Sequence, residues 1–552
     1  MECGDTRLRV PAYLGFSVRF TSRGMLSAHL LQVLHLSPKS LSRCNTKEEY
    51  NMAAVVALER AAYGTKSRAV LEFLAGAPKQ LLINGKWVPA KSGKTFETVN
   101  PANEEVLALV AEGDKADVDE AVKAARTAFE SGTWPNMNPH QRARTVFKMA
   151  DIIEAHSEEL AELVTLENGK PITESEAEVV RAVDAFRYYA GWATKIYGET
   201  NPSSPDFFNY TLREPVGVCG QIIPWNGPLS TVSWKVAPAL ALGNTLILKP
   251  AEQTPLVALR ATELILEAGL PDGVINVVTG FGETAGAAIA SHPDIDKVAF
   301  TGSTEVGKLI LKASAGNLKR VSLELGGKSP NVIFPDADLE QAASVSASGI
   351  FRNQGQVCCA ASRMFVQERV YDEFAERLSS RAGEIKLGQP LDRQTTMGPL
   401  VSKEQHDRVL GYLKLAQQEG ATAKIGGERG PQDKGYFVKP TVYTRVRNDM
   451  RIAQEEIFGP VAVVIPFKDE NDAVLQGNDT TYGLAAGVWT KDVSRAHAVA
   501  RKLRAGSVWV NCYNMIDPVS PFGGYKQSGF GRELGKHSIE LYTQIKTVYV
   551  KL

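Results

Sequence analysis

The 552-residue sequence has no excess of either charge and no long apolar run. Its 62 Lys and Arg residues balance 62 Asp and Glu residues, so nothing global attracts the chain to nucleic acid or to an anionic membrane. No run of about 18 apolar residues occurs, so we expect no membrane span. With 44% hydrophobic residues, the chain is typical of a globular protein long enough for two or more domains.

Cysteine is scarce as well, and its spacing is irregular. The six residues are Cys3, Cys44, Cys219, Cys358, Cys359 and Cys512, and no C-x-x-C motif is present. This pattern favours neither a zinc site nor a disulfide framework, so we expect no metal. Thiols of this kind are typical of a reducing compartment such as the cytoplasm or the mitochondrial matrix.

The first 51 residues differ in composition from the rest of the chain. Residues 1–46 contain six basic residues against two acidic ones, which are Arg7, Arg9, Arg19, Arg23, Lys39 and Arg43 against Glu2 and Asp5. This bias is typical of a mitochondrial presequence. The alternative is upstream sequence added by an early start codon, with translation beginning near Met52. The predicted location is therefore the cytoplasm, or the mitochondrial matrix if residues 1–51 are a presequence.

From residue 216 onward, short apolar runs alternate five times with helical patterns, which predicts a parallel sheet covered by helices on both faces. The helix of "TPLVALRATELILEAGLP" is predicted to have Thr254 as N-cap and Pro255 in its first turn. A second α/β series follows residue 327. The alternating segments 207–215 and 542–552 are expected to be strands outside both sheets. Ligands of such sheets bind at the carboxyl ends of the strands, after Ile223, Lys249, Val278, Thr301 and Leu325.

Two of these strand-end loops suggest a nucleotide. "FTGSTEVGKL" nearly matches a phosphate-binding loop, but Leu309 stands where a hydroxyl must hold Mg²⁺, which disfavours a nucleotidase. Its backbone N–H groups can still hold a pyrophosphate, and a turn without a ligand is the alternative. In "LKPAEQTP", Lys249 and Glu252 follow a strand; an acidic residue there accepts from ribose hydroxyls and repels a 2′-phosphate, which favours NAD over NADP. Glu252 can equally be a charge in the first turn of a helix.

The other loops suggest acyl chemistry. "IIPWNGPL" places the Asn226 amide after a strand, where its N–H groups can stabilise an oxyanion or where it is only a turn residue. "LELGGKSP" places Glu324 at a strand end, where a desolvated carboxylate becomes basic enough to activate water, or where it pairs with a Lys.

The adjacent cysteines of "FRNQGQVCCAASR" are the third such feature. A papain-like site needs a His base, and none of the 8 His residues lies in the loops above. A Cys at a helix start needs no His, because the helix dipole lowers its pKa. Two buried residues without a chemical role remain the alternative.

Seven segments, in this order, resemble the NAD(P)-dependent aldehyde dehydrogenase superfamily from about residue 80 to 552: "PWNGPL", "KPAEQTP", "FTGSTEVG", "LELGGKSP", "NQGQVCCAASR", "EEIFGPV" and "PFGGYKQSGFGRE". The resemblance implies an α/β fold. It consists of a Rossmann-type NAD-binding domain (64–195 and 216–326), a catalytic α/β domain (327–526) and oligomerisation strands (196–215 and 542–552) of a homodimer or homotetramer.

The resemblance also implies the roles of individual residues. Cys358 is the nucleophile, Glu324 the water-activating base and Asn226 the oxyanion donor, with Lys235 and Glu533 as a proton-relay pair. The implied cofactor contacts are Ile222, Ile223, Trp225, Lys249, Glu252, Gly282, Gly302, Ser303, Leu325, Glu456 and Phe458.

The implied reaction is oxidation of an aldehyde to its acid through a Cys358 thioester, with NAD as acceptor. The expected pocket is lined by Gly227, Ser230, Thr231, Trp234, Val357, Cys359, Ile516, Asp517 and Phe522. Small residues at 227, 230 and 231 favour a bulky or aromatic aldehyde, and the sequence also resembles bacterial phenylacetaldehyde dehydrogenases. Asp517 would instead favour a betaine or amino aldehyde, and broad aliphatic specificity is a further alternative. A catalytically silent protein on the same fold is the competing class.

Overall fold

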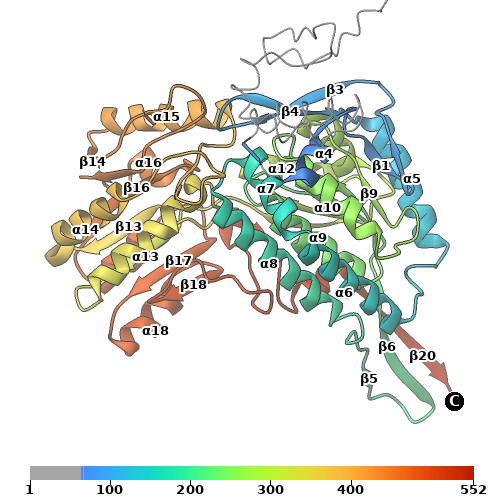
Figure 1. The fold of residues 1–552 in the computed structure, drawn as a ribbon. Coiled ribbons are helices and arrows are strands. Elements are labelled where there is room, and N and C mark those ends of the chain that lie inside the picture. Colours follow the sequence, from blue (N-terminus) through green and yellow to red (C-terminus); the bar gives the residue numbers. More distant parts are fainter. Residues whose placement is uncertain (1–63, 66) are drawn as a thin grey trace, which may run out of the picture.

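The computed structural model describes residues 64–65 and 67–552, so Cys3, Cys44 and the predicted presequence lie outside the described residues. Two α/β lobes lie side by side, and a thin β arm projects from one of them (Figure 1). Among the described residues, no helix is long and apolar enough to cross a membrane.

The first lobe is built on an eight-stranded sheet with the order β19-β11-β10-β7-β8-β9-β1-β2. Five central strands are parallel: β7 (Val218–Ile222), β8 (Thr245–Lys249), β9 (Ile275–Val277), β10 (Lys297–Thr301) and β11 (Arg320–Glu324). The edge strands β1 (Leu81–Ile83), β2 (Lys86–Val88) and β19 (Gly529–Phe530) pair antiparallel. The parallel sheet predicted from residue 216 onward is therefore confirmed, and short antiparallel strands from other parts of the chain extend it at both edges.

Helices cover both faces of this sheet. They are α4 (Arg68–Leu74), α5 (Lys115–Glu130), α6 (Pro139–Ala155), α7 (Ser157–Asn168), α8 (Ile172–Ala190), α9 (Pro228–Ala241), α10 (Leu256–Leu266), α11 (Ala287–Ser291), α12 (Thr304–Ser314) and the π-turn η2 (Gly282–Gly286). Alternation along β8 explains the two layers. Leu246 and Leu248 enter one apolar cluster, and Ile247 enters the cluster on the opposite face.

The helix α10 begins differently from the prediction. Pro255, not Thr254, is its N-cap residue, and it offers no side-chain acceptor. Instead the buried Glu167 carboxylate of α7 accepts from the backbone N–H groups of Leu256 (2.7 Å) and Val257 (3.0 Å). A carboxylate on a neighbouring helix thus takes the place of a local cap.

The second lobe contains a seven-stranded sheet with the order β14-β15-β16-β13-β12-β17-β18. The strands are β12 (Pro330–Ile333), β13 (Arg363–Gln367), β14 (Thr422–Ile425), β15 (Thr441–Thr444), β16 (Val461–Phe467), β17 (Ala485–Trp489) and β18 (Ser507–Val510). Only β14 pairs antiparallel. The helices are α13 (Leu339–Phe351), α14 (Tyr371–Gly383), α15 (Lys403–Gln418), α16 (Arg451–Gln454), α17 (Glu470–Asn478) and α18 (Val493–Lys502), with short turns η3 (Arg352–Gly355) and η4 (Glu368–Val370). The turn η5 (Lys526–Ser528) leads back to β19 of the first sheet, and α19 (Ser538–Tyr542) packs on the first lobe through Ile539 and Tyr542.

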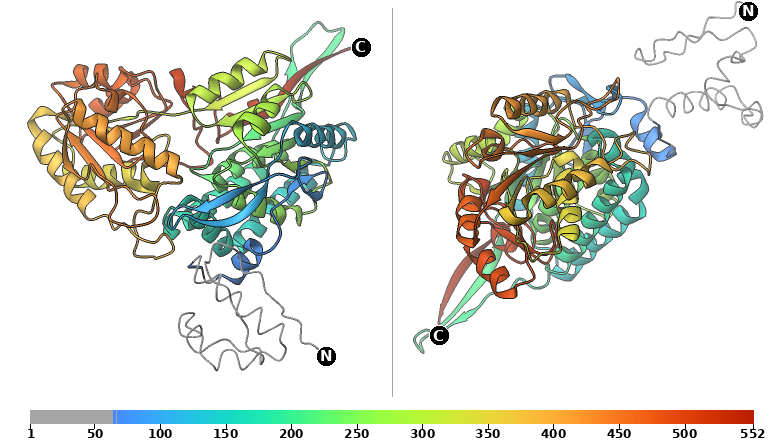
Figure 2. Two further views of the ribbon diagram at one scale, coloured as in Figure 1. Left: turned by 90° about the horizontal axis from the view of Figure 1, so that it is seen from above. Right: turned by 90° about the vertical axis from the view of Figure 1, so that its left-hand side faces the viewer.

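The projecting arm consists of β5 (Thr200–Asn201), β6 (Phe207–Pro215) and β20 (Thr543–Lys551). β6 and β20 pair antiparallel without a register shift, from Thr543 opposite Pro215 to Lys551 opposite Phe207. Both views in Figure 2 show the arm extending away from the two lobes. The predicted strands outside the main sheets are thus confirmed. A separate hairpin-like pair joins β3 (Thr95–Asn100) to β4 (Glu105–Ala111).

Candidate active site

The site lies where the strand order of the first sheet reverses. Its parallel strands follow the order β11-β10-β7-β8-β9. Strands β8 and β9 are added on one side of β7, and β10 and β11 on the other, so the order reverses at the boundary between β7 and β10. Doubly wound sheets bind ligands at the carboxyl ends of the strands at such a point. The loop after β7 carries Asn226, and Thr301 ends β10. The second lobe approaches this edge with the segment that contains Cys358.

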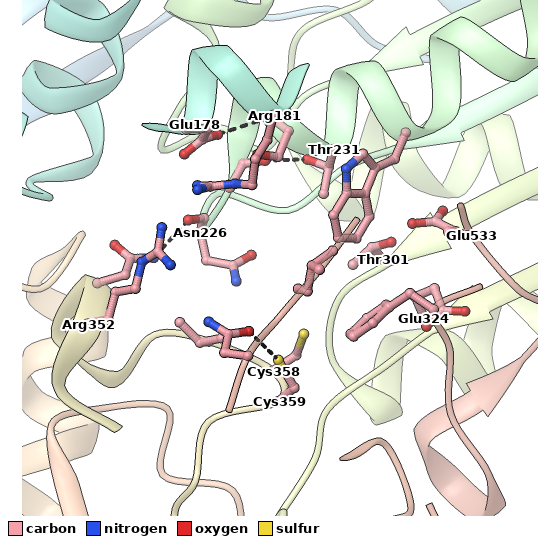
Figure 3. Close-up of a pocket in the computed structure, with 18 of the residues that line it drawn as sticks. Glu178, Arg181, Asn226, Thr231, Thr301, Glu324, Arg352, Cys358, Cys359 and Glu533 are labelled. Atoms are coloured by element: carbon pink, nitrogen blue, oxygen red, sulfur yellow. Dashed lines mark hydrogen bonds between the residues drawn. The ribbon is translucent and has the colours of Figure 1, made fainter. Parts of the chain in front are cut away.

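A pocket of about 250 Å³ occupies this junction, and most of the predicted site residues line it (Figure 3). These are Asn226, Gly227, Ser230, Thr231, Trp234, Glu324, Leu325, Val357, Cys358, Cys359, Ile516, Phe522 and Glu533. Asp517 is not among the lining residues, although the preceding Ile516 is, so its place near the mouth stays a prediction. Its side chain is exposed, and its carboxylate accepts from the Val519 N–H at 2.9 Å, which turns it back onto its own loop.

An unusual backbone tract precedes Cys358. Asn353, Gln354 and Gly355 have positive φ angles of 47°, 56° and 73°, and a side chain at Gly355 would meet the carbonyl oxygen of Gly459 at 2.0 Å. Such conformations are uncommon for residues other than Gly and persist only where neighbouring contacts enforce them. Here the Asn353 Nδ2 group donates to the Gln356 carbonyl at 3.2 Å. The tract directs the following turn, with Cys358, into the pocket.

Cys358 lies in that turn and not at the start of a helix, so the predicted lowering of its pKa by a helix dipole is wrong. Its hydrogen bond with Cys359 raises the pKa of the thiol well above its ordinary value, and burial and the carboxyls of Glu456 and Glu324 act in the same direction. Cys359 itself is buried, and its Sγ lies 3.3 Å from Asn514 Oδ1. The two thiols thus differ: Cys358 faces the pocket space, and Cys359 packs beneath it.

The Asn226 amide is held firmly in place. Its Nδ2 donates to the Gln356 carbonyl at 3.0 Å, which leaves the second N–H of the same group available to the pocket that Asn226 lines. The Asn226 backbone carbonyl accepts from Lys170 Nζ (2.9 Å) and from Asn353 Nδ2 (2.8 Å). These bonds tie the loop after β7 to the connection between α7 and α8 and to the turn before Cys358, so the amide is preorganised as a donor.

Glu324 ends β11 with only 4% of its surface exposed, and neither carboxyl oxygen has a hydrogen-bond partner among the described residues. Burial raises the pKa of Glu324 well above its ordinary value, and nearby Glu533 reinforces the shift. Glu533 forms a buried ion pair with Lys235 of α9. A basic carboxyl therefore lines the same pocket as the Cys358 thiol, together with the paired carboxylate of Glu533.

The predicted cofactor residues gather at the carboxyl edge of the first sheet. Buried Lys249 ends β8, and its Nζ lies 3.3 Å from the Glu252 carboxylate, whose side chain remains 30% exposed. Ser303 caps α12 through the Val306 N–H at 3.3 Å, and Gly302 precedes it. No atom lies within 4 Å of where a side chain of Gly282 would begin. A hydroxyl acceptor, a helix N-terminus and open space near Gly282 fit a dinucleotide.

The second lobe completes this edge. Glu456 accepts from the Gly327 N–H at 2.9 Å, and burial raises its pKa to about 7. The rings of Phe458 and Trp225 meet edge to face, 5.2 Å apart. Ile222, Ile223 and Leu325 are buried behind these contacts and form the apolar floor of the edge. The contact between Trp225 and Phe458 and the bond from the Gly327 N–H to Glu456 thus join the second lobe to the carboxyl edge of the first sheet.

Several lining residues were not predicted. They are Lys170, Glu174, Glu178, Arg181, Thr301, Arg352, Asn353, Asn514 and Met515. Three of them, Glu174, Glu178 and Arg181, recur at helical spacing on one face of α8. That spacing was the available signal, but charged residues in a helix are more often exposed, and nothing local indicates that this face meets a pocket.

Comparisons with known proteins are consistent across the chain. A family model described as "Aldehyde dehydrogenase family" matches residues 87–548. The putative aldehyde dehydrogenase DhaS of Bacillus subtilis is 54% identical over 481 residues, covering 87% of this chain and 97% of that protein. The NAD⁺ complex of an aldehyde dehydrogenase from Bacillus cereus has 54% identity and a TM-score of 0.87, covering 88% of this chain and 99% of that one. The NAD⁺ complex of betaine aldehyde dehydrogenase from Staphylococcus aureus has 44% identity and a TM-score of 0.86, covering 88% and 97%.

Proposed function

Because the chain belongs to the aldehyde dehydrogenase family and is thus an aldehyde-oxidising enzyme with an NAD-type cofactor, we propose that it oxidises a bulky or aromatic aldehyde with NAD, through a thioester on Cys358. The observation that carries the proposal is that Cys358, Glu324 and Asn226 all line the same pocket. Phenylacetaldehyde is the model substrate.

The proposed reaction begins at Cys358. Its thiolate attacks the aldehyde carbon, forming a carbon–sulfur bond and an oxyanion that accepts from the free Asn226 N–H and from the Cys358 backbone N–H. Bound NAD supplies the hydride acceptor for the next step, which leaves a thioester on Cys358. Glu324 then takes a proton from water, the hydroxide attacks the thioester, and the acid leaves with restoration of the thiolate. Lys235 and Glu533 form the relay pair that removes this proton from Glu324.

The walls of the pocket support a bulky substrate. Gly227, Ser230 and Thr231 contribute little volume. One turn further along α9, the ring of Trp234 lies 5.7 Å from the ring of Phe522, and both rings line the same pocket. A pocket with apolar and aromatic walls and a few polar groups suits an aldehyde with a large apolar body.

The competing substrate is a cationic aminoaldehyde, because one of the similar structures is a betaine aldehyde dehydrogenase. The residue expected to attract a cation, Asp517, is outside the pocket lining. The pocket carboxylates Glu174 and Glu178 are already engaged by Arg352 and Lys170. This arrangement favours the uncharged aldehyde over the cation.

We propose NAD rather than NADP, because the Glu252 carboxylate would repel a 2′-phosphate. The predicted location is the cytoplasm, or the mitochondrial matrix if residues 1–51 are a presequence. We also propose self-association to a dimer or tetramer through the arm. Its exposed residues Phe208, Ile545 and Tyr549 are 46%, 60% and 65% accessible, which is typical of strands that are covered in an assembly.

NADH formation with phenylacetaldehyde, acetaldehyde and betaine aldehyde, each measured with NAD and NADP, tests the substrate and the cofactor. We expect the largest kcat/KM with phenylacetaldehyde and NAD. Higher kcat/KM with betaine aldehyde, or with NADP, would overturn the corresponding choice. Light scattering of the purified protein tests the assembly, and a monomer at micromolar concentration would refute it.

A further inference from the structure

The end of the pocket away from Glu324 carries an unusual set of charges. Three cationic side chains (Lys170, Arg181 and Arg352) and two carboxylates (Glu174 and Glu178) line it. In Figure 3, Arg181 and Arg352 lie on one side of the pocket, Glu324 lies on the opposite side, and Cys358 lies below and between them. The excess of one positive charge is therefore at a distance from the reacting carboxyl.

Both carboxylates at this end are already occupied. Glu178 accepts from Lys170 Nζ at 2.6 Å and from the backbone N–H groups of Leu229 (2.9 Å) and Ser230 (3.0 Å). It thereby caps α9 and compensates Lys170. Glu174 accepts from the Asn353 N–H at 3.0 Å and lies 3.6 Å from Arg352 Nε. Neither has a hydrogen bond or ion pair with Arg181.

Arg181 is thus the cation of this pocket end for which the described residues provide no hydrogen bond and no ion pair. Its side chain is half-buried on the pocket face of α8. Burial, and then the neighbouring Arg352 guanidinium, lower the pKa of Arg181, and the Glu178 and Glu174 carboxylates offset this only in part; a guanidinium nevertheless stays charged at neutral pH. A partly desolvated charge without a directly bonded counter-ion is unfavourable, and an anion bound beside it would relieve both the desolvation and the repulsion from Arg352.

We infer that Arg181, assisted by Arg352, recognises a carboxylate at the far end of the aldehyde, so that the substrate class is an aldehyde with an apolar body and a terminal carboxylate. The inference rests on the proposed function and specifies its substrate. A guanidinium matches a planar carboxylate with two parallel hydrogen bonds. The single uncompensated positive charge matches one carboxylate better than a phosphate, which carries about −1.5 to −2 charges. The same charge repels a cationic aminoaldehyde.

A matched series of substrates tests the inference. We would measure kcat and KM with NAD for ω-oxo acids of four to ten carbons and for n-alkanals of the same lengths. The enzyme is expected to prefer the acid about tenfold or more in kcat/KM at one optimal length, since a charged hydrogen-bonded pair contributes more than a neutral one. The preference should weaken at high salt because exposed charge is screened.

Substitutions assign this preference to Arg181. Arg181→Gln should raise KM for the optimal oxo acid about tenfold while kcat and all alkanal constants change less than about twofold. Arg181→Lys should retain part of the preference, and Arg352→Gln should have a smaller effect because Glu174 already pairs with Arg352. The control is Arg187→Gln on the same helix, since Arg187 pairs with Asp151 and Glu154 outside the pocket.

The possible failures are distinct. If alkanals are oxidised without any preference for the oxo acids, or if Arg181→Gln affects both series equally, the inference is wrong and the proposed function stands. If no aldehyde yields NADH, the proposed function itself fails. Should Arg181→Gln fail to fold, the Arg181→Lys variant and the salt dependence of the unmodified enzyme decide the question.

Discussion

The two ends of the pocket differ in how they are encoded. The reacting end is formed by residues that directly follow strands or belong to one short motif, such as Glu324 and Cys358. The charged end is formed by one face of α8, a helix in the N-terminal part of the chain, and by Arg352 just before the nucleophile turn. In the proposed function, the first end acts on the group that all aldehydes share, whereas the second contacts the part of the substrate in which aldehydes differ.

The largest expected effect tests the asymmetry within the reacting end. Cys358→Ala removes the nucleophile and should lower kcat at least about a thousandfold, because no other group can form the thioester. Cys359→Ala is the matched control. It removes a packed thiol that makes no bond to the substrate, so kcat should stay within about fivefold. An active Cys358→Ala variant would show that the nucleophile is misassigned.

Replacing Glu324 separates the two half-reactions. Glu324→Gln cannot activate water, so turnover should fall about a hundred- to ten-thousandfold while the first enzyme equivalent of NADH still appears. Stopped-flow measurement of that first equivalent provides the comparison. A loss of the initial NADH as well would mean that Glu324 acts before the thioester forms.

The same variant has a predicted pH signature. The folded-state pKa of Glu324 is raised, so above the ordinary value of 4.5 the unfolded chain releases this proton before the folded protein does. Stability of the unmodified enzyme therefore falls as pH rises between the two values. Glu324→Gln lacks this loss, and its Tm advantage should grow with pH. A constant Tm difference from pH 5 to pH 9 would contradict the raised pKa.

Asn226→Asp tests the oxyanion donor with little change of shape. An ionised carboxylate offers no N–H and repels the developing oxyanion, so kcat should fall about a hundred- to a thousandfold, with a smaller change in KM. The loop itself is held mainly by bonds to the Asn226 backbone carbonyl, which the substitution preserves. A variant with full kcat would show that backbone N–H groups alone stabilise the oxyanion.

Sequence patterns predicted where Glu324 and Asn226 lie because local features fix their positions, whereas the family resemblance assigned their roles and selected Cys358. A strand end places Glu324 and the loop after β7 places Asn226, whatever packs against them. Sequence patterns could not predict contacts between elements that are distant in the chain. The cap of α10 is the Glu167 carboxylate, which comes from another helix, and not the predicted Thr254. The two-residue strand β19 is too short to show a sequence pattern. The Cys358 turn was mistaken for a helix start because its left-handed tract depends on tertiary contacts. The α8 charges show helical spacing, but their partners lie in other segments.

The smallest expected effect on activity concerns Glu178, which joins the two ends of the pocket. Burial alone would raise its pKa, but Lys170 and the bond from the Ser230 N–H outweigh burial and hold the pKa below its ordinary value. Glu178→Gln leaves Lys170 without its counter-ion and should destabilise the protein by about 3–5 kcal/mol, with about a tenfold loss of kcat/KM through the displaced Asn226 loop.

The matched control for Glu178 is Glu176→Gln on the same helix. Glu176 pairs with Arg393 at the surface, where both side chains are largely exposed, so its loss should cost less than about 1 kcal/mol. Because the Glu178 pKa is lowered, its contribution to stability is present above pH 4.5 and is lost as pH falls through the folded-state value. Denaturant unfolding over a series of pH values should therefore show the largest difference from the unmodified enzyme at pH 7 and a shrinking difference as the pH falls below 4.5. Equal losses throughout the series would mean that Glu178 acts through packing and not through its charge, and the link between the charged end and the Asn226 loop would then be steric.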